Sequence, residues 1–515
     1  MEPFRFCLRA LALGTLAVGI AHAASPNIVF ILSDDMGYGD PHYAGGKVPT
    51  PNLDRLTTEG MRFTDAHTSS AVCTPTRYGV LTGRYNWRST LKDGVLQGNS
   101  PPLLGNDRTT VAEFLKEAGY RTAVFGKWHL GLGWSKLAKN RTAESGPTEG
   151  TGWGLDYEKK VTRGPLTEGF DEDFIIPASL DMAPFVYLRN DKPTAIPTVT
   201  KTWVRPGAAA ADFEAVNCIP DFAKEARGFI RRSAEAKDKP FFLYLPLSSP
   251  HTPLVPSEAW KGKSGIGDYG DFLMETDWAV GEVLAELEAQ GVAKDTLLVF
   301  TSDNGFAPYV GLKEQIDKGH KPVGDLRGAK ADVYEGGHRV PFIVRWPGVV
   351  KAGSSSSATI CLNDFFATAA DAIGKLSDIP PSAAEDSFTL MPLLKGTDGY
   401  ARAFTIHHSV NGSFAIRQGD WKLCLCSDSG GWSDPKPGTP EAKAAYPVQL
   451  FDLAKDPAEK KNLAESEPER VKELAAVLAK AIREGRTRPG APQSNDGKAI
   501  EFPERVTELL PVLKD

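Results

Sequence analysis

Short apolar runs without polar alternation recur along the 515-residue chain, and segments with helical patterns separate them. Asn27–Leu32 reads NIVFIL, and Phe241–Leu247, Thr296–Phe300 and Phe342–Trp346 are similar runs. Strands of this kind are buried on both faces, as in the parallel sheets of α/β proteins. One of the intervening helices begins with a capping box at Thr110. We therefore predict an α/β fold in which helices sandwich a large mixed, mostly parallel sheet.

The sequence pattern changes after about residue 395. Beyond this point come four short segments with strand character and then a charged helical segment, Pro468–Glu484. The strand-like segments are Ala403–Ile406, Phe414–Arg417, Trp421–Cys426 and Gln449–Leu453. We predict an N-terminal domain of residues 24–395 and a smaller C-terminal domain, residues 396–515, of antiparallel sheet plus helix.

The N-terminus has the features of an export signal. Arg5 and Arg9 give it a positive charge, and the apolar segment Leu11–Ile20 is too short to span a bilayer. Ala21-His22-Ala23 fits the small-residue rule for a cleavage site. We expect residues 1–23 to be a signal peptide and the mature protein to be exported, periplasmic or secreted, without stable insertion in a membrane.

Charge and cysteine content argue against two other classes. The chain has 59 basic and 65 acidic residues, whereas nucleic-acid binders are usually basic, so no nucleic-acid partner is expected. Loss of Cys7 with the signal leaves an odd number of cysteines without the spacing of a zinc site. We expect these cysteines to be reduced and packed: Cys73, Cys218, Cys361, Cys424 and Cys426.

Polar residues follow the ends of four predicted strands, namely Asn27–Leu32, Arg121–Phe125, Phe241–Leu247 and Thr296–Phe300. In open α/β sheets, ligands bind beyond the carboxyl ends of the strands, so these side chains should share one edge. Four of them offer hard oxygen ligands of the kind that calcium and magnesium prefer. The oxygen ligands are Asp34, Asp35, Asp303 and Asn304, and the other groups are Lys127, His129 and His251.

Cys73 begins the segment Cys-Thr-Pro-Thr-Arg, in which Pro75 suits the first turn of a helix. A helix N-terminus stabilises an anion, so this position favours a reactive nucleophile. A cysteine protease is therefore a rival interpretation, because histidines are available elsewhere in the chain.

Several motifs taken together resemble the sulfatase family. Cys73-x-Pro75-x-Arg77 with Leu81-Thr82-Gly83 resembles the motif whose Cys or Ser is oxidised to Cα-formylglycine. The resemblance covers nearly the whole mature chain and implies the alkaline-phosphatase-like fold. The further motifs, in the family's order, are Asp34-Asp35, Thr50-Pro51-Asn52-Leu53-Asp54, Gly126-Lys127-Trp128-His129-Leu130-Gly131, Ser249-Pro250-His251, Ser302-Asp303-Asn304-Gly305, Arg327-Gly328-x-Lys330 and Leu450-Phe451-Asp452-Leu453.

The resemblance also implies a mechanism. A maturation enzyme would convert Cys73 to formylglycine, whose hydrate attacks the sulfur of a sulfate ester, and the sulfated diol would then expel sulfate. One Ca²⁺ would be held by Asp34, Asp35, Asp303, Asn304 and the modified Cys73. The metal would orient the sulfate and ease ionisation of the attacking hydroxyl, with Asp303 accepting its proton.

The remaining roles implied by the resemblance concern charge and proton transfer. Arg77, Lys127 and Lys330 would stabilise charge on the sulfuryl oxygens and the diol. His129 would take the second proton of the diol, and His251 or Lys330 would protonate the leaving oxygen. Expected substrate contacts are Lys127, His251, Lys330, Ser179 and His407, the last of which follows a predicted strand.

The leading hypothesis is thus a sulfatase that acts on sulfate esters, with a sulfated carbohydrate as the expected substrate class. One alternative is a formylglycine-dependent phosphomonoesterase, phosphodiesterase or phosphonate hydrolase. We find no additional His and Asp ligands for the second metal of a two-metal phosphatase. Another alternative is a non-catalytic protein that binds sulfoglycans, if Cys73 remains unmodified.

Overall fold

A ten-stranded mixed sheet organises the fold of the N-terminal part of the chain. The computed structural model describes residues 25–137 and 150–514, so the predicted signal peptide lies outside the described residues. Five central strands are parallel. In spatial order they are β11 (Thr296–Ser302), β1 (Asn27–Ser33), β10 (Phe241–Pro246), β4 (Arg121–Lys127) and β5 (Glu172–Ile176). The predicted mixed, mostly parallel sheet is confirmed.

Short strands complete the sheet on both sides of this parallel centre. Beyond β11 lie β12 (Phe342–Arg345), β2 (Met61–Phe63) and β13 (Ser354–Ser356), and β12 runs antiparallel to both of its neighbours. Beyond β5 lie β6 (Leu188–Arg189) and β7 (Lys192–Pro193), which are also antiparallel. The strand ends at the site therefore belong to the parallel centre, whereas the antiparallel strands form its margins.

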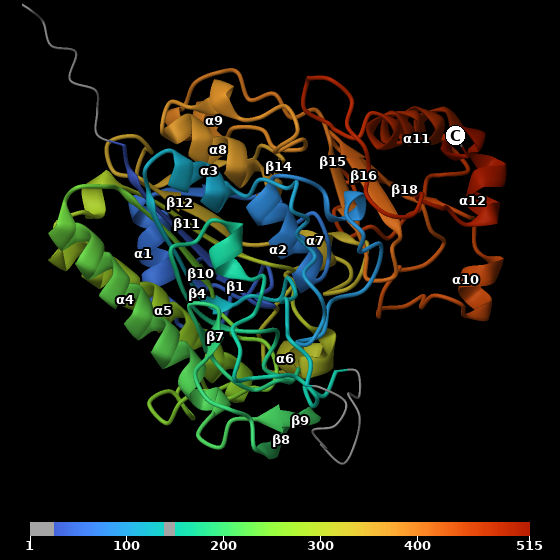
Figure 1. Cartoon of the computed structure of the whole chain (residues 1–515). Helices are drawn as coiled ribbons and strands as arrows, with labels where there is room; N and C mark the ends of the chain where they lie inside the picture. Colours follow the sequence, from blue (N-terminus) through green and yellow to red (C-terminus); the bar gives the residue numbers. More distant parts are fainter. Residues whose placement is uncertain (1–24, 138–149, 515) are drawn as a thin grey trace, which may run out of the picture.

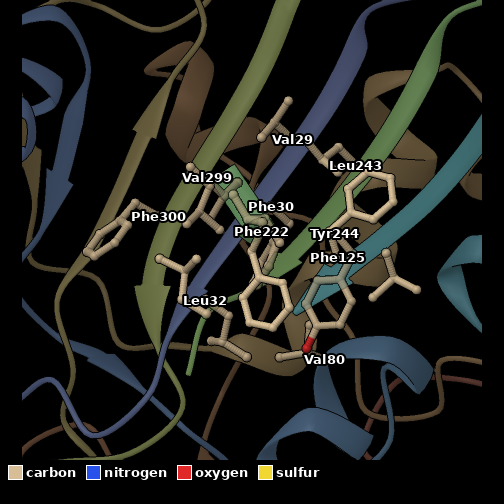
Figure 2. Packing of buried hydrophobic residues seen from close by; sticks show 14 of the residues in the cluster. Val29, Phe30, Leu32, Val80, Phe125, Phe222, Leu243, Tyr244, Val299 and Phe300 are labelled. Atoms are coloured by element: carbon tan, nitrogen blue, oxygen red, sulfur yellow. The ribbon is translucent and has the colours of Figure 1, made fainter. Parts of the chain in front are cut away.

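Apolar side chains on both faces of the central strands bury the sheet. Figure 2 shows Val29 and Phe30 of β1 beside Leu243 of β10, and all three are fully buried. The ring of Phe30 lies 4.3 Å from that of Phe365, a residue of the helix α8 (Phe365–Ala372). Burial on both faces explains why these strands lack polar alternation.

Helices cover both faces of the sheet (Figure 1). One layer packs against β4, β10 and β12, and another surrounds α8. The first layer contains α1 (Pro51–Glu59), α4 (Cys218–Ala236) and α5 (Asp268–Ala289). The second contains α2 (Cys73–Thr82) and α3 (Val111–Glu117), and the capping box at Thr110 is present as predicted.

A separate four-stranded antiparallel sheet lies in the C-terminal part of the chain (Figure 1). Its strands are β15 (Thr405–His408), β16 (Phe414–Gln418), β17 (Trp421–Cys424) and β18 (Gln449–Asp452), and α11 (Pro468–Arg483) packs on β16 and β17. The predicted sheet and helix are confirmed. Tyr85, Trp87 and Cys361 join the hydrophobic core of this region, so that core extends across the predicted boundary at residue 395.

The remaining elements are short. They include the antiparallel hairpin of β8 (Val199–Trp203) and β9 (Arg205–Ala209), which stands apart from the large sheet. In the described chain the five cysteines are free and buried, as predicted. The described residues contain no helix that is both long enough and apolar enough to cross a membrane. The other short elements are β3 (Ala66–His67), β14 (Ile360–Cys361), α6 (Leu312–Asp317), α7 (Glu335–His338), α9 (Met391–Lys395), α10 (Pro440–Ala444) and α12 (Glu504–Leu509).

Candidate active site

The four predicted oxygen ligands meet beyond the carboxyl ends of β1 and β11. These strands are parallel neighbours, and the backbone N–H of Asp303 donates to the carbonyl of Ser33 at 3.1 Å. The N–H of Asp35 donates to Oδ1 of Asp303 at 3.2 Å, and Nδ2 of Asn304 donates to Oδ1 of Asp35 at 2.7 Å. The predicted convergence of Asp34, Asp35, Asp303 and Asn304 is therefore present in the fold.

Three buried cations face the three carboxylates. Nζ of Lys127 lies 2.7 Å from Oδ2 of Asp34, at the end of β4. The guanidinium of Arg77, on α2, lies 2.7 Å from Oδ2 of Asp303. Nζ of Lys330 lies 2.5 Å from Oδ1 of Asp35. The formal charges of these six groups cancel before any ligand binds.

The pKa values show that the carboxylates compete for positive charge. Burial raises the pKa of Asp303 to about 7, and the negative charge of Asp34 adds to this effect. Burial also opposes ionisation of Asp34, but Lys127, His251 and Arg77 outweigh it and hold the pKa of Asp34 well below its usual range. A further cation at this point would stabilise the ionised form of both carboxylates.

The donor atoms fit a hard divalent cation. Oδ1 of Asp34 and Oδ1 of Asn304 are buried without a hydrogen-bond partner in the part of the chain that the structure describes. Asp34, Asp35 and His251 can each place one ligand atom within 4.8 Å of the others. Buried polar atoms normally have partners, so two unpaired oxygens beside two further carboxylates suit an oxygen-liganded ion such as Ca²⁺.

Cys73 is the first residue of α2 and is only 3% exposed. Burial raises the pKa of its thiol, although the charges of Lys127 and Lys330 act in the opposite direction. For the unmodified side chain, desolvation therefore opposes ionisation of the thiol more strongly than the neighbouring lysines favour it. A protonated thiol also suits cysteine-protease chemistry poorly, since the thiolate is the nucleophile.

His129 is arranged to accept a proton. Its Nε2 donates to the carbonyl of Leu96 at 2.8 Å, which leaves the lone pair on Nδ1, and Nδ1 is buried without a partner among the described residues. Burial, together with Lys127 and Arg77, holds the pKa of His129 well below its usual value. The imidazole is neutral, and its unpaired nitrogen is a base. The backbone has a φ of 56° here, a strained value of the kind found at functional sites.

Ser179 and His251 complete the polar wall beside Lys127. Nζ of Lys127 donates to Oγ of Ser179 at 2.9 Å, and this hydroxyl lies 3.3 Å from the ring of His251. Nδ1 of His251 donates to the carbonyl of Thr252, which leaves Nε2 directed at Oδ2 of Asp35, 3.6 Å away. Burial and the charge of Lys330 lower the pKa of His251.

A cavity of about 560 Å³ opens above these groups, and Cys73, His251 and Lys330 line it. Sequence analysis missed Tyr309, whose hydroxyl lies 3.3 Å from Oδ2 of Asp35 and 3.4 Å from Nε2 of His251. Tyr309 lies five positions after Asn304, so its place after the end of a strand could have pointed to it as a site residue. Trp432 also lines the cavity but comes from the C-terminal part, where no motif marks it.

His407 does not reach this cavity. Its ring is fully buried and stacks on His338 with centroids 3.9 Å apart. Nδ1 contacts the carbonyl of Thr68, and Nε2 contacts the hydroxyl of Thr405, both at 2.9 Å. The expected substrate contact of His407 is corrected: the side chain lies against His338 and the backbone of Thr68, between the C-terminal sheet and the N-terminal part of the chain.

Comparison with known proteins identifies the family. The family described as Sulfatase matches residues 26–375. The chain belongs to the sulfatase family. It is 34% identical to an N-acetylgalactosamine-6-O-sulfatase of Bacteroides thetaiotaomicron, over 89% of this chain and 93% of that protein. It is also 34% identical to arylsulfatase A of Bos taurus, over 91% of this chain and 88% of the relative.

A solved structure has the same architecture. The match is a Bacteroides thetaiotaomicron sulfatase that was studied in connection with the metabolism of multiple glycosaminoglycans. The TM-score is 0.78 at 33% identity, over 89% of this sulfatase and 99% of that chain. Membership of the family makes the protein a sulfuric ester hydrolase, which confirms the predicted enzyme class and the alkaline-phosphatase-like fold.

Proposed function

We propose that this sulfatase hydrolyses a sulfate ester of a sulfated carbohydrate, with a formylglycine made from Cys73 as the nucleophile and one Ca²⁺ at the carboxylates. The main support is the position of Cys73, which lines a cavity of about 560 Å³ together with Lys330 and His251. The relative named for N-acetylgalactosamine-6-O-sulfatase activity supports a sugar substrate. The exposed rings of Tyr309 and Trp432 suit the apolar face of a sugar.

Asp34, Asp35, Asp303, Asn304 and the modified Cys73 would hold the metal. Bound there, Ca²⁺ would orient the sulfate and favour ionisation of the attacking hydroxyl. The three carboxylates are already balanced by three cations, so a divalent ion gives the site a net positive charge. An anionic sulfate ester is the ligand that matches this charge.

Each remaining residue has a role that its contacts support. The hydrated formylglycine supplies one hydroxyl that attacks sulfur and a second whose deprotonation lets the sulfate leave. Asp303 would take the proton of the attacking hydroxyl, and Nδ1 of His129, which has no partner, would take the second proton. The doubly protonated ring of His251, through Nε2, or the ammonium of Lys330 would donate a proton to the leaving oxygen as its bond to sulfur breaks.

Charge stabilisation would come from three buried cations and one hydroxyl. Lys330 lines the cavity, and Lys127 lies beside it in contact with Ser179. Arg77 holds Asp303 and donates to the carbonyl of Lys127 at 2.8 Å. Ser179 would contact the hydrated formylglycine or the sulfate through the hydroxyl that now contacts Lys127.

Three further parts of the proposal concern export, maturation and the division into domains. We propose residues 1–23 as a signal peptide, with export to the periplasm or beyond the cell. A formylglycine-generating enzyme would be the partner that converts Cys73. We also propose residues 24–395 as the catalytic domain and 396–515 as the C-terminal subdomain. The C-terminal subdomain contributes Trp432 to the wall of the cavity.

Three measurements test the proposal. Mass spectrometry of the tryptic peptide Phe63–Arg77, from protein made in a host with the maturation enzyme, should detect formylglycine in place of Cys73. That protein should release sulfate from at least one member of a panel of defined sulfated saccharides, and Cys73→Ala should abolish release without loss of folding. A matched pair of sulfate and phosphate esters of one phenol checks the phosphatase alternative. Complete retention of the thiol in the native host would instead favour a binding protein.

A further inference from the structure

Asp181 is an acidic residue in the active-site cavity for which the proposed reaction has no role. It lies two residues after Ser179, on the loop that follows β5, and it lines the same cavity as Cys73. Its surface is only 6% exposed. The sulfate end of this cavity is cationic, so a carboxylate in the same wall needs a different ligand.

The carboxylate of Asp181 has too few partners for a buried charge. Oδ1 is buried without a hydrogen bond among the residues that the structure describes. Oδ2 lies 3.4 Å from the guanidinium of Arg205, a side chain that is 51% exposed. A long ion pair to a half-exposed partner contributes little, and a buried polar oxygen without a donor is costly. A ligand that brings a donor into the cavity would remove this cost.

The loop that carries Asp181 is held at both ends. The N–H of Met182 donates to the carbonyl of Ser179 at 2.9 Å. Further along, the N–H of Phe185 donates to Ala208 of β9 at 2.8 Å. Gly207 of the same strand is so close to this loop that a Cβ on it would lie 2.1 Å from Cβ of Ala183. The backbone of the loop that carries the carboxylate is therefore held in place before a ligand arrives.

Aromatic rings line another part of the same cavity. The centroids of Tyr309 and Trp432 are 5.7 Å apart, and Trp432 is 40% exposed. Together with apolar wall residues such as Met182 they offer packing surface with only a few polar groups. A sugar fits such a site because its C–H groups can pack on the rings while its hydroxyls reach a carboxylate.

We propose that Asp181 accepts a hydrogen bond from a free hydroxyl of the sugar that carries the scissile sulfate. The residue thereby selects sugars with a hydroxyl at that position and rejects those with a second sulfate there, because two negative charges would meet in a buried place. This inference rests on the proposed function, since it assumes that the leaving group is a sugar.

Binding to the Cys73→Ala protein tests the role without turnover. The two probes are inorganic sulfate and N-acetylgalactosamine 6-sulfate, measured by calorimetry with and without Asp181→Ala. Loss of the carboxylate should raise the Kd of the sugar sulfate about tenfold or more, as expected for a hydrogen bond to a charged group. It should lower the Kd of inorganic sulfate, because a negative charge has been removed. Damage to the cavity would weaken both ligands, and that result would overturn the proposal.

Turnover by the formylglycine form gives an independent check. Asp181→Asn keeps an acceptor oxygen but loses the charge, so it should raise kcat/KM for N-acetylgalactosamine 4,6-disulfate relative to the 6-sulfate. Asp212→Ala, which removes an exposed carboxylate outside the cavity wall, is the matched control and should leave this ratio unchanged. An unchanged ratio in Asp181→Asn would contradict selection by this residue.

The failure of this inference can be told apart from the failure of the proposed function. Release of sulfate from an aryl ester, but from no saccharide of the panel, would overturn the role of Asp181 and leave the sulfatase reaction intact. Release from neither class by protein that contains formylglycine would reject the proposed function itself.

Discussion

The ammonium of Lys127 lies 2.7 Å from Oδ2 of Asp34, and neither side chain is exposed to solvent. This ion pair joins the carboxyl ends of β4 and β1, two strands that β10 separates. Oδ1 of the same aspartate is buried and has no partner in the described chain, and Lys127 also donates to Ser179. The pair therefore connects the proposed metal site with the polar wall beside Cys73.

Replacement of Lys127 by alanine should lower kcat by about 10²–10³-fold, by analogy with the loss of one oxyanion donor. The free energy of unfolding should fall as well, because Asp34 would keep a buried charge without its partner. Steady-state kinetics on a sulfate ester and urea unfolding measure the two effects. Lys116→Ala, which removes a surface lysine of α3, is the control and should change neither quantity appreciably. Wild-type kcat in Lys127→Ala would exclude this side chain from charge stabilisation.

Calcium should stabilise the folded protein. An ion that binds only the native state raises the free energy of unfolding by about 2.7 kcal/mol at 100 times its Kd. The melting temperature should therefore rise on addition of Ca²⁺ to chelator-treated protein and fall again with excess chelator. Asp303→Asn should abolish most of this response, whereas Asp378→Asn, at an exposed ion pair, should retain it. A melting temperature of the wild type that does not respond to Ca²⁺ would argue against the metal site.

The loss of activity on substitution of His251 or Lys330 should depend on the leaving group of the ester, and this dependence should differ between the two residues. The residue that protonates the leaving oxygen matters most for a poor leaving group such as a sugar alkoxide, and least for nitrophenolate. Kinetics of His251→Ala and Lys330→Ala on both ester types should therefore show a larger loss on the sugar for one variant. Lys330 is held as a cation by Asp35, which outweighs the burial that opposes its charge and keeps its pKa well above the usual value. If each variant lost the same activity on the two esters, both residues would be excluded as the general acid.

The parallel centre of the fold could be predicted because each strand there is apolar on both faces. The predicted run Thr296–Phe300 corresponds to β11, which is two residues longer. The run Asn27–Leu32 corresponds to β1, which is one residue longer. The ends of strands are harder to predict, because they depend on pairing with neighbouring strands as well as on the local sequence pattern. β15 begins at Thr405 rather than at Ala403, because its register is set by pairing with β16.

The site was predictable where parallel strands carry polar residues to one edge, which applies to Asp34, Asp303 and Lys127. It was not predictable where long-range packing decides the direction of a side chain. His407 was expected in the cavity, but pairing of Ala415 opposite it and stacking on His338 turn it into the protein. Asp181 and Trp432 lie in the cavity wall without any local motif, because loops far apart in sequence meet there.

A buried acidic pair away from the site should make stability depend on pH. The N–H of Asp191 donates to Oδ2 of Asp173 at 3.0 Å, while Oδ1 of each residue is buried and has no partner within residues 25–137 and 150–514. Burial raises the pKa of Asp173 from 3.8 to about 7, and the charge of Asp191 adds to the effect. The native state thus holds a proton that the unfolded chain releases above pH 3.8.

Because the native pKa of Asp173 is the higher one, its contribution to stability is complete below pH 3.8 and is lost as the pH rises through about 7. In this window the free energy of unfolding should fall by about 1.4 kcal/mol per pH unit through this group. Asp173→Asn removes the ionisation and keeps an acceptor for the N–H of Asp191, so it should unfold at a higher urea concentration than the wild type at pH 8. At pH 5 the difference should shrink. Asp107→Asn, at an exposed carboxylate, is the control, and parallel pH profiles for Asp173→Asn and the wild type would refute the assignment.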